Sequence, residues 1–216
     1  MKSIKILLKK EISLELRNKG SFYANVLFVV SSTYVASLLA GNNINLKVWS
    51  AIYWIIMMFT SFNVTLNGSL KESRTKLFYQ YTLFGPTYYF LSKALWYFVF
   101  IFILNLLGFL LWGILGIGFD NGFLFCLVLL LNSIVFSCLL SVLSFLSAKA
   151  NGNFALMSIL SLPILIPDLL IIAKLSTLLL DDFAISVYSK YLTALGVLSL
   201  ISLILGLVLF PYLWKE

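Results

Sequence analysis

Asp168 is the one acidic residue that lies well inside a long apolar segment of the chain. Carboxyl groups are rare within membrane-spanning segments and usually functional there. One interpretation is a proton or cation site, or a polar contact to a partner helix. The other is a carboxyl beside an interrupted helix, close enough to the outer interface to reach water and shielded by Lys174. We expect the second, because one acid without a partner cannot run a proton relay.

Two prolines, Pro163 and Pro167, interrupt the same apolar segment. Each removes a backbone N–H donor and leaves a carbonyl one turn earlier unpaired. In lipid this is tolerated only where protein or water satisfies the carbonyl. Two interpretations stay open: a kink that lets the outer half of the segment move, with Asp168 beside it, or a static kink used for packing.

The chain lacks the residue types for most catalytic and cofactor chemistry. It contains no His, which excludes imidazole ligation of haem iron and a Ser-His-Asp set. No GxxxxGK[ST] motif is present, so ATP binding by a P-loop is excluded. Cys126 and Cys138 stand in one apolar block, where we expect small buried hydrophobic residues. We therefore predict no catalytic residue, no directly bound cofactor and no metal site, so a partner must supply energy for any work.

A polar segment over residues 71–84 alternates charged and aromatic side chains. Arg and Tyr are enriched at protein interfaces because they give contact area and directional bonds at modest entropic cost. We predict that this segment docks an ATPase; the alternative is an ordinary loop anchored in lipid headgroups. The residues predicted to make the contact are Lys71, Glu72, Arg74, Tyr79 and Tyr81.

The apolar segments that surround these residues require a membrane. Of 216 residues 62% are hydrophobic and 11% charged, whereas a soluble domain carries about 25% charged residues. The apolar blocks are as long as a bilayer is thick. The sequence predicts six spans, with Trp49, Tyr53 and Trp54 as interfacial anchors of the second span. The predicted spans are residues 22–40, 48–70, 88–117, 123–147, 154–173 and 188–213, with a loop over 174–187.

Residues 3–19 have the pattern of an amphipathic helix. Apolar Ile4, Leu7, Leu8, Ile12 and Leu16 recur at near-helical spacing, and the lysines with Glu11 and Glu15 take the other face. Such a helix lies on the membrane with its basic face toward anionic headgroups. The alternative is a plain polar tail.

The positive charges orient the spans. Of the 15 Lys and Arg residues, all but Lys47, Lys174 and Lys190 fall in the two tails and the loops that share their side. Because positive charge marks the cytoplasmic side, both termini are predicted to be cytoplasmic, and we expect no nucleic-acid binding. The fold class is an all-α polytopic membrane protein. It forms one domain over 1–216, with an interfacial helix (1–20), a six-helix bundle (22–213) and a cytoplasmic coupling segment (71–87).

The chain resembles the haem exporter protein B (CcmB) family, the membrane subunit of an ABC-type complex in cytochrome c maturation. Three segments carry the resemblance, together with the size and the six-span layout. They are Lys9–Arg17 before the first span, Lys71–Arg74 followed by Tyr79, Tyr81, Leu83, Pro86 and Leu91–Lys93, and the Leu-Pro-x-x-Ile-Pro pattern that ends Leu156–Pro167.

The resemblance implies an ABC-2-like or type V exporter-like permease in the inner membrane. It further implies a partner ATPase that binds ATP, companion cytochrome c maturation subunits, a haem chaperone, and haem handled by the complex, with this chain present as a homodimer or in a heteromer. Two other functions stay open. One is a generic ABC-2-type permease for a drug, lipid or peptide; the other is a membrane assembly factor that works without an ATPase.

Overall fold

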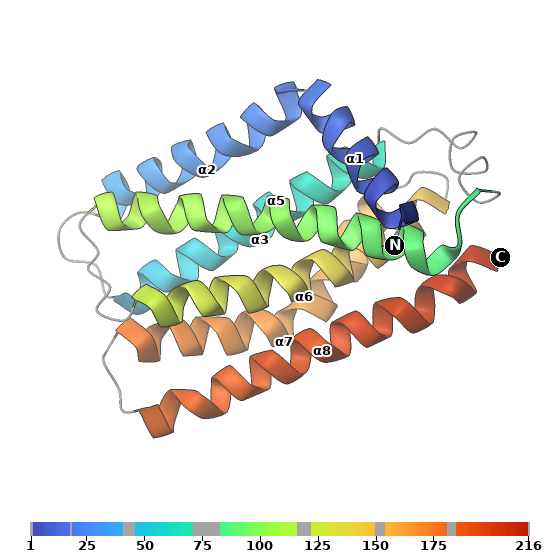
Figure 1. Ribbon diagram of the computed structural model, residues 1–216. Coiled ribbons are helices and arrows are strands. Elements are labelled where there is room, and N and C mark those ends of the chain that lie inside the picture. Colours follow the sequence, from blue (N-terminus) through green and yellow to red (C-terminus); the bar gives the residue numbers. More distant parts are fainter. Residues whose placement is uncertain are drawn as a thin grey trace.

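The computed structural model describes residues 2–17, 19–40, 46–70, 83–115, 122–149, 154–180 and 185–215, and these residues are organised as long helices (Figure 1). A short N-terminal helix comes first and six longer ones follow. They are α1 (Lys2–Arg17), α2 (Lys19–Ala40), α3 (Leu46–Leu70), α5 (Pro86–Ile114), α6 (Gly122–Lys149), α7 (Phe154–Leu180) and α8 (Ile185–Lys215).

Among the described residues, six helices, α2 to α8, are long and apolar enough to cross a membrane. This confirms the prediction of a helical fold with six helices that could span a membrane. The helices run up and down, so each end of the bundle collects a fixed set of helix ends (Figure 1). One end holds α1, the start of α2, the end of α3, the start of α5, the end of α6, the start of α7 and the end of α8; the other holds the remaining helix ends (Figure 1).

Five of the six spans begin and end within three residues of their predicted bounds, but the fifth does not. Helix α7 continues to Leu180, through residues 174–180 that the sequence predicted as loop. Lys174, the first residue of that predicted loop, is exposed on the helix, and its Nζ lies 5.6 Å from the centre of the Tyr191 ring on α8. Leu175 and Leu179 are buried in the bundle, and their packing favours the extra turns.

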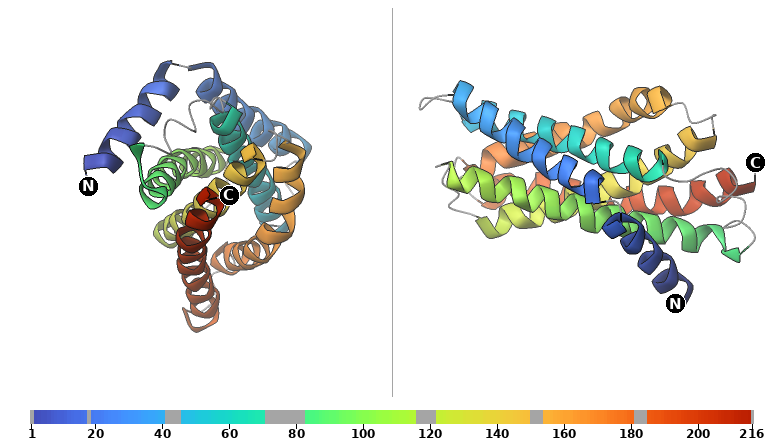
Figure 2. Two further views of the ribbon diagram at one scale, coloured as in Figure 1. Left: turned by 90° about the vertical axis from the view of Figure 1, so that its right-hand side faces the viewer. Right: turned by 90° about the horizontal axis from the view of Figure 1, so that it is seen from above.

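Helix α6 lies at the centre and packs against α3, α5, α7 and α8. A view along the bundle shows that α2 and α8 lie farther from its centre than α6 (Figure 2, left). Close approach between α3 and α5 depends on glycine: a methyl group at Gly108 would overlap the Met57 side chain, and one at Gly68 would lie 2.5 Å from the Tyr97 hydroxyl. Small residues allow such approach in membranes.

The three aromatic residues predicted as interfacial anchors are instead core residues, and that prediction is wrong. Trp49, Tyr53 and Trp54 are 7%, 0% and 1% exposed. The Trp54 indole N–H donates to Ser176 Oγ at 2.8 Å, and the Tyr53 hydroxyl donates to the Asn105 carbonyl at 2.9 Å. Buried Trp and Tyr usually find such partners, and here α3 is held to α7 and α5 by them.

Candidate functional site

The five residues predicted to contact an ATPase, Lys71, Glu72, Arg74, Tyr79 and Tyr81, lie outside the described residues. The helices that flank them are described. Helix α3 ends at Leu70 and α5 begins at Pro86, at the end of the bundle that also holds α1 and the C-terminus (Figure 1).

Helix α1 packs against α5 rather than lying apart from the bundle (Figure 2, right). Leu7 is 2% exposed, and Glu11, predicted with the lysines on the polar face, is 8% exposed. Ile12, predicted on the apolar face, is exposed. The helix is therefore turned from its predicted orientation, because the Glu11 carboxylate meets a cation on α5.

That cation is Lys93, whose Nζ lies 3.1 Å from Glu11 Oε2. The Lys93 and Glu11 side chains are 9% and 10% exposed, so the ion pair is almost fully buried. Lys10 Nζ lies 3.5 Å from the other carboxylate oxygen, and the Tyr97 ring centre lies 5.9 Å from Lys93 Nζ. A buried pair with such neighbours fixes the position of α1 on α5, since either charge alone would be costly to bury.

The other side of this first part of α5 packs into an aromatic cluster. Tyr89 and Phe90 of α5 meet Phe145 of α6 and Phe210 of α8, with ring centres 4.5–6.4 Å apart. Aromatic pairs at such separations are attractive beyond their buried area. Gly206 of α8 makes the approach possible, because a methyl group there would overlap the Phe90 ring. Helix α5 is therefore held by α1 on one face and by α6 and α8 on another.

The structure contradicts the expectation that Asp168 reaches water near the outer interface. Asp168 is 0% exposed and lies twelve residues before the end of α7, near its middle. Neither carboxylate oxygen has a hydrogen-bond partner among the described residues. The misplacement follows from the predicted end of the span, which the structure moves from residue 173 to Leu180.

Pro163 and Pro167 lie within α7, which stays helical across both. Both proline residues are exposed, on a different face from Asp168, so their rings are not part of the packing inside this chain. Both interpretations of these prolines stay open: a kink that lets the outer half of the segment move, and a static kink used for packing.

A polar layer crosses the bundle near the level of Asp168. The Asn105 amide of α5 donates to Ser133 Oγ of α6 at 2.9 Å, and Ser133 in turn donates to the Leu129 carbonyl at 2.7 Å. The neighbouring Asn132 is 0% exposed, and neither of its amide atoms has a hydrogen-bond partner among the described residues. Polar groups so deep in a span are expensive, so they indicate either a helix contact or a functional site.

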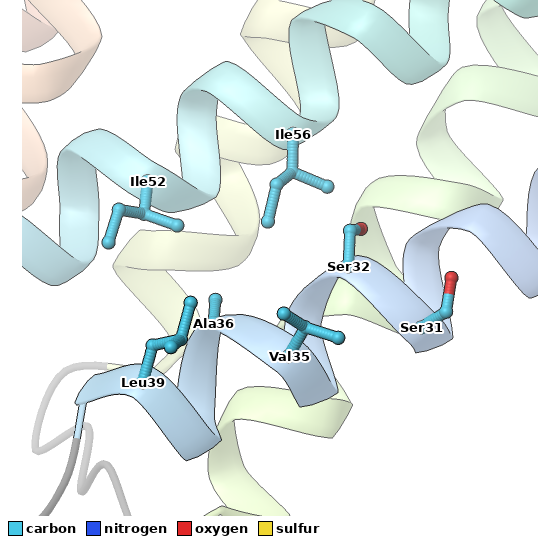
Figure 3. Close-up of a pocket in the computed structure, with 7 residues that line it drawn as sticks. All are labelled: Ser31, Ser32, Val35, Ala36, Leu39, Ile52 and Ile56. Atoms are coloured by element: carbon cyan, nitrogen blue, oxygen red, sulfur yellow. The ribbon is translucent and has the colours of Figure 1, made fainter.

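No group of three or more His, Cys, Asp and Glu residues within the described ranges could hold a metal ion. A groove of about 570 Å³ lies between α2 and α3 (Figure 3). Its walls are Ser31, Ser32, Val35, Ala36 and Leu39 of α2 and Ile52 and Ile56 of α3. Both serine hydroxyls donate to the Phe28 carbonyl of their own helix. The groove is uncharged, so it has nothing that would select an ionic ligand.

Comparison of the chain with protein-family models, with curated proteins and with solved structures gives no match.

Sequence reasoning missed the Glu11–Lys93 pair and the Asn105–Asn132–Ser133 layer. A signal for the second was visible, since Asn105, Asn132 and Ser133 interrupt long apolar runs. The pair had no such signal, because its members are 82 positions apart and each has a plausible headgroup contact in isolation.

Proposed function

We propose that this protein is the membrane permease subunit of an ABC-type complex in cytochrome c biogenesis. In this function it couples a partner ATPase to haem delivery, or to release of a haem chaperone, across the cytoplasmic membrane. The observation that carries the coupling role is the docking of α1 on α5 by the buried Glu11–Lys93 pair, beside the segment that joins α3 to α5. The cytochrome c part rests on the family resemblance.

The charge distribution supports a cytoplasmic position for this end of the bundle. The tails and the 71–93 segment hold most of the 15 Lys and Arg residues, and Lys47, Lys174 and Lys190 belong to helices near the opposite end. Lys and Arg accumulate on the cytoplasmic side of membrane proteins. An ATPase in the cytoplasm would then face α1, the start of α5 and the coupling segment.

The helices themselves supply the means of transmission. Helix α5 begins within the last residues of the coupling segment, with Pro86 in its first turn, and continues to Ile114. A push on the segment would act on α5 and, through Lys93 and Glu11, on α1 as one unit. The chain needs no nucleotide site of its own in this role, because ATP is bound and hydrolysed by the partner.

The test is charge reversal in the coupling segment. Glu72→Arg combined with Arg74→Glu is expected to abolish co-purification of an ATPase in mild detergent and to stop cytochrome c assembly. The matched control is Lys47→Glu, which reverses an exposed charge at the opposite end of the bundle and should change neither result.

Each outcome separates the candidate functions. Normal ATPase capture and normal cytochrome c assembly in the reversed variant would overturn the docking role. An ATPase that co-purifies with the parent chain, without any cytochrome c defect on deletion, would identify a generic ABC-2-type permease instead. Absence of any ATPase in the parent purification would favour an assembly factor.

A further inference from the structure

Asp168 of α7 and Asn132 of α6 are both fully buried, on two antiparallel helices that pack against each other. On α7, Asp168 is three residues after Leu165 and four before Ile172; on α6, Asn132 is four residues after Val128 and three before Val135. Leu165 packs in one apolar cluster with Val135, and Ile172 packs in a second with Val128. Each polar residue therefore shares a helix face with members of the same two clusters.

The same clusters set their depth. Because α6 and α7 run in opposite directions, the Leu165 and Val135 level lies to one side and the Ile172 and Val128 level to the other. Asp168 and Asn132 both fall between those levels. An acid and an amide, each 0% exposed and each without a described hydrogen-bond partner, thus occupy one layer between two apolar clusters.

The surroundings offer Asp168 no fixed positive charge. The elements packed against α7 are α3, α6 and α8. Their described charged residues are Lys47 of α3, Lys149 at the last position of α6, and Lys190 and Lys215 of α8, of which Lys215 ends its helix. Lys47 and Lys190 are exposed, and Lys174 of α7 itself is exposed and lies over Tyr191. The other titratable residues described on these elements are uncharged: Tyr53, Cys126, Cys138, Tyr188, Tyr191 and Tyr212. A buried carboxylate with no counter-charge must be neutralised by something small enough to enter.

We propose that Asp168 is a proton-binding site at the centre of the bundle, and that the Asn132 amide oxygen accepts the hydrogen bond of the protonated acid. The proton comes from a hydronium ion. The carboxylate oxygen gains the O–H bond, and the hydronium ion becomes water. A proton fits better than a metal cation, because an acid and an amide satisfy each other as a pair, whereas a metal ion needs several oxygen ligands. This inference does not depend on the proposed function.

The test is infrared spectroscopy of the purified protein in lipid, comparing the parent with Asp168→Asn. A carboxylic-acid carbonyl band, sensitive to exchange into D₂O, is expected in the parent and should be lost in Asp168→Asn. Asn132→Leu, which removes the acceptor, should move that band to higher wavenumber without removing it. Because Asn has the shape of the neutral acid, Asp168→Asn should melt within about 3 °C of the parent.

If Asp168→Asn loses carboxylate bands and keeps the carboxylic-acid band, then Asp168 is ionised in the parent, and the proposal is overturned. A bound metal cation is the competing outcome. It would appear as a melting temperature that rises with sodium or potassium in the parent but not in Asp168→Asn, and it would equally overturn the proposal. An acid band that does not move in Asn132→Leu would show that the partner is wrong.

Discussion

Neutralising Glu11 should release α1 from α5, and the size of the effect follows from burial. In Glu11→Gln the Lys93 ammonium loses the Glu11 carboxylate, 3.1 Å away, while the residue remains only 7% exposed. Breaking a buried pair costs about 3–5 kcal/mol, whereas an exposed pair contributes about 1 kcal/mol or less. Lys93 keeps its contact with the Tyr97 ring, so we expect the lower end of the range, about 3 kcal/mol.

The measurement is thermal unfolding in mild detergent, arranged as a double-mutant cycle. A loss of about 3 kcal/mol in a chain of this length lowers the melting temperature by about 6–12 °C. The cycle uses Glu11→Gln, Lys93→Met and the combination of both. The double variant leaves neither position 11 nor position 93 charged, so it should be less destabilised than the sum of the single variants, with a coupling energy of about 2 kcal/mol.

The control is Lys9→Gln, because Lys9 is exposed on the same helix. Its effect should stay within about 0.5 kcal/mol. A coupling energy below about 0.5 kcal/mol between positions 11 and 93 would place the pair in the range of exposed ion pairs. The buried clamp between α1 and α5 would then be refuted, together with its part in the coupling role.

Two further predictions concern packing and a buried donor. Gly206→Ala should destabilise the protein by about 1–3 kcal/mol, because the added methyl group overlaps the Phe90 ring. The control is Gly196→Ala on the same helix, where an added methyl group meets nothing within 4 Å. This control should be neutral or stabilising by up to about 1 kcal/mol. Equal melting temperatures for the two variants would contradict the close packing. Ser176→Ala leaves the Trp54 indole N–H without its acceptor, so the free energy of unfolding should fall by about 1–3 kcal/mol. Thermal unfolding measures this change, and an unchanged stability would mean that the bond contributes nothing.

The six spans could be predicted from sequence because lipid imposes a simple rule. A segment must stay apolar for the thickness of the bilayer, and that length is visible in the residue order. The one large boundary error is at α7, where the predicted loop began at Lys174 but the helix continues to Leu180. A lysine can remain on a helix when its long side chain reaches polar or aromatic neighbours, as it does over Tyr191.

The side on which each residue lies could not be predicted in the same way. In a membrane the lipid-facing and the helix-facing sides are both apolar, so the periodicity that marks a buried face in water is weak. Trp54 was therefore interpreted as an interfacial anchor, although it is buried and hydrogen-bonded to Ser176. The predicted docking residues could not be tested by position, since they lie outside the described residues.

Helix α5 connects the two polar features that the structure reveals. Lys93 stands near its first turns, and Asn105 lies twelve residues further along, about 18 Å up the helix axis. Asn105 is bonded to Ser133, the immediate neighbour of Asn132 on α6. Because a helix is stiff over this length, a tilt imposed at Lys93 must either break the Asn105–Ser133 bond or carry α6 with it. Under the proposed function, the signal from the ATPase side therefore reaches the layer that contains Asp168 through the backbone of α5 and one side-chain bond.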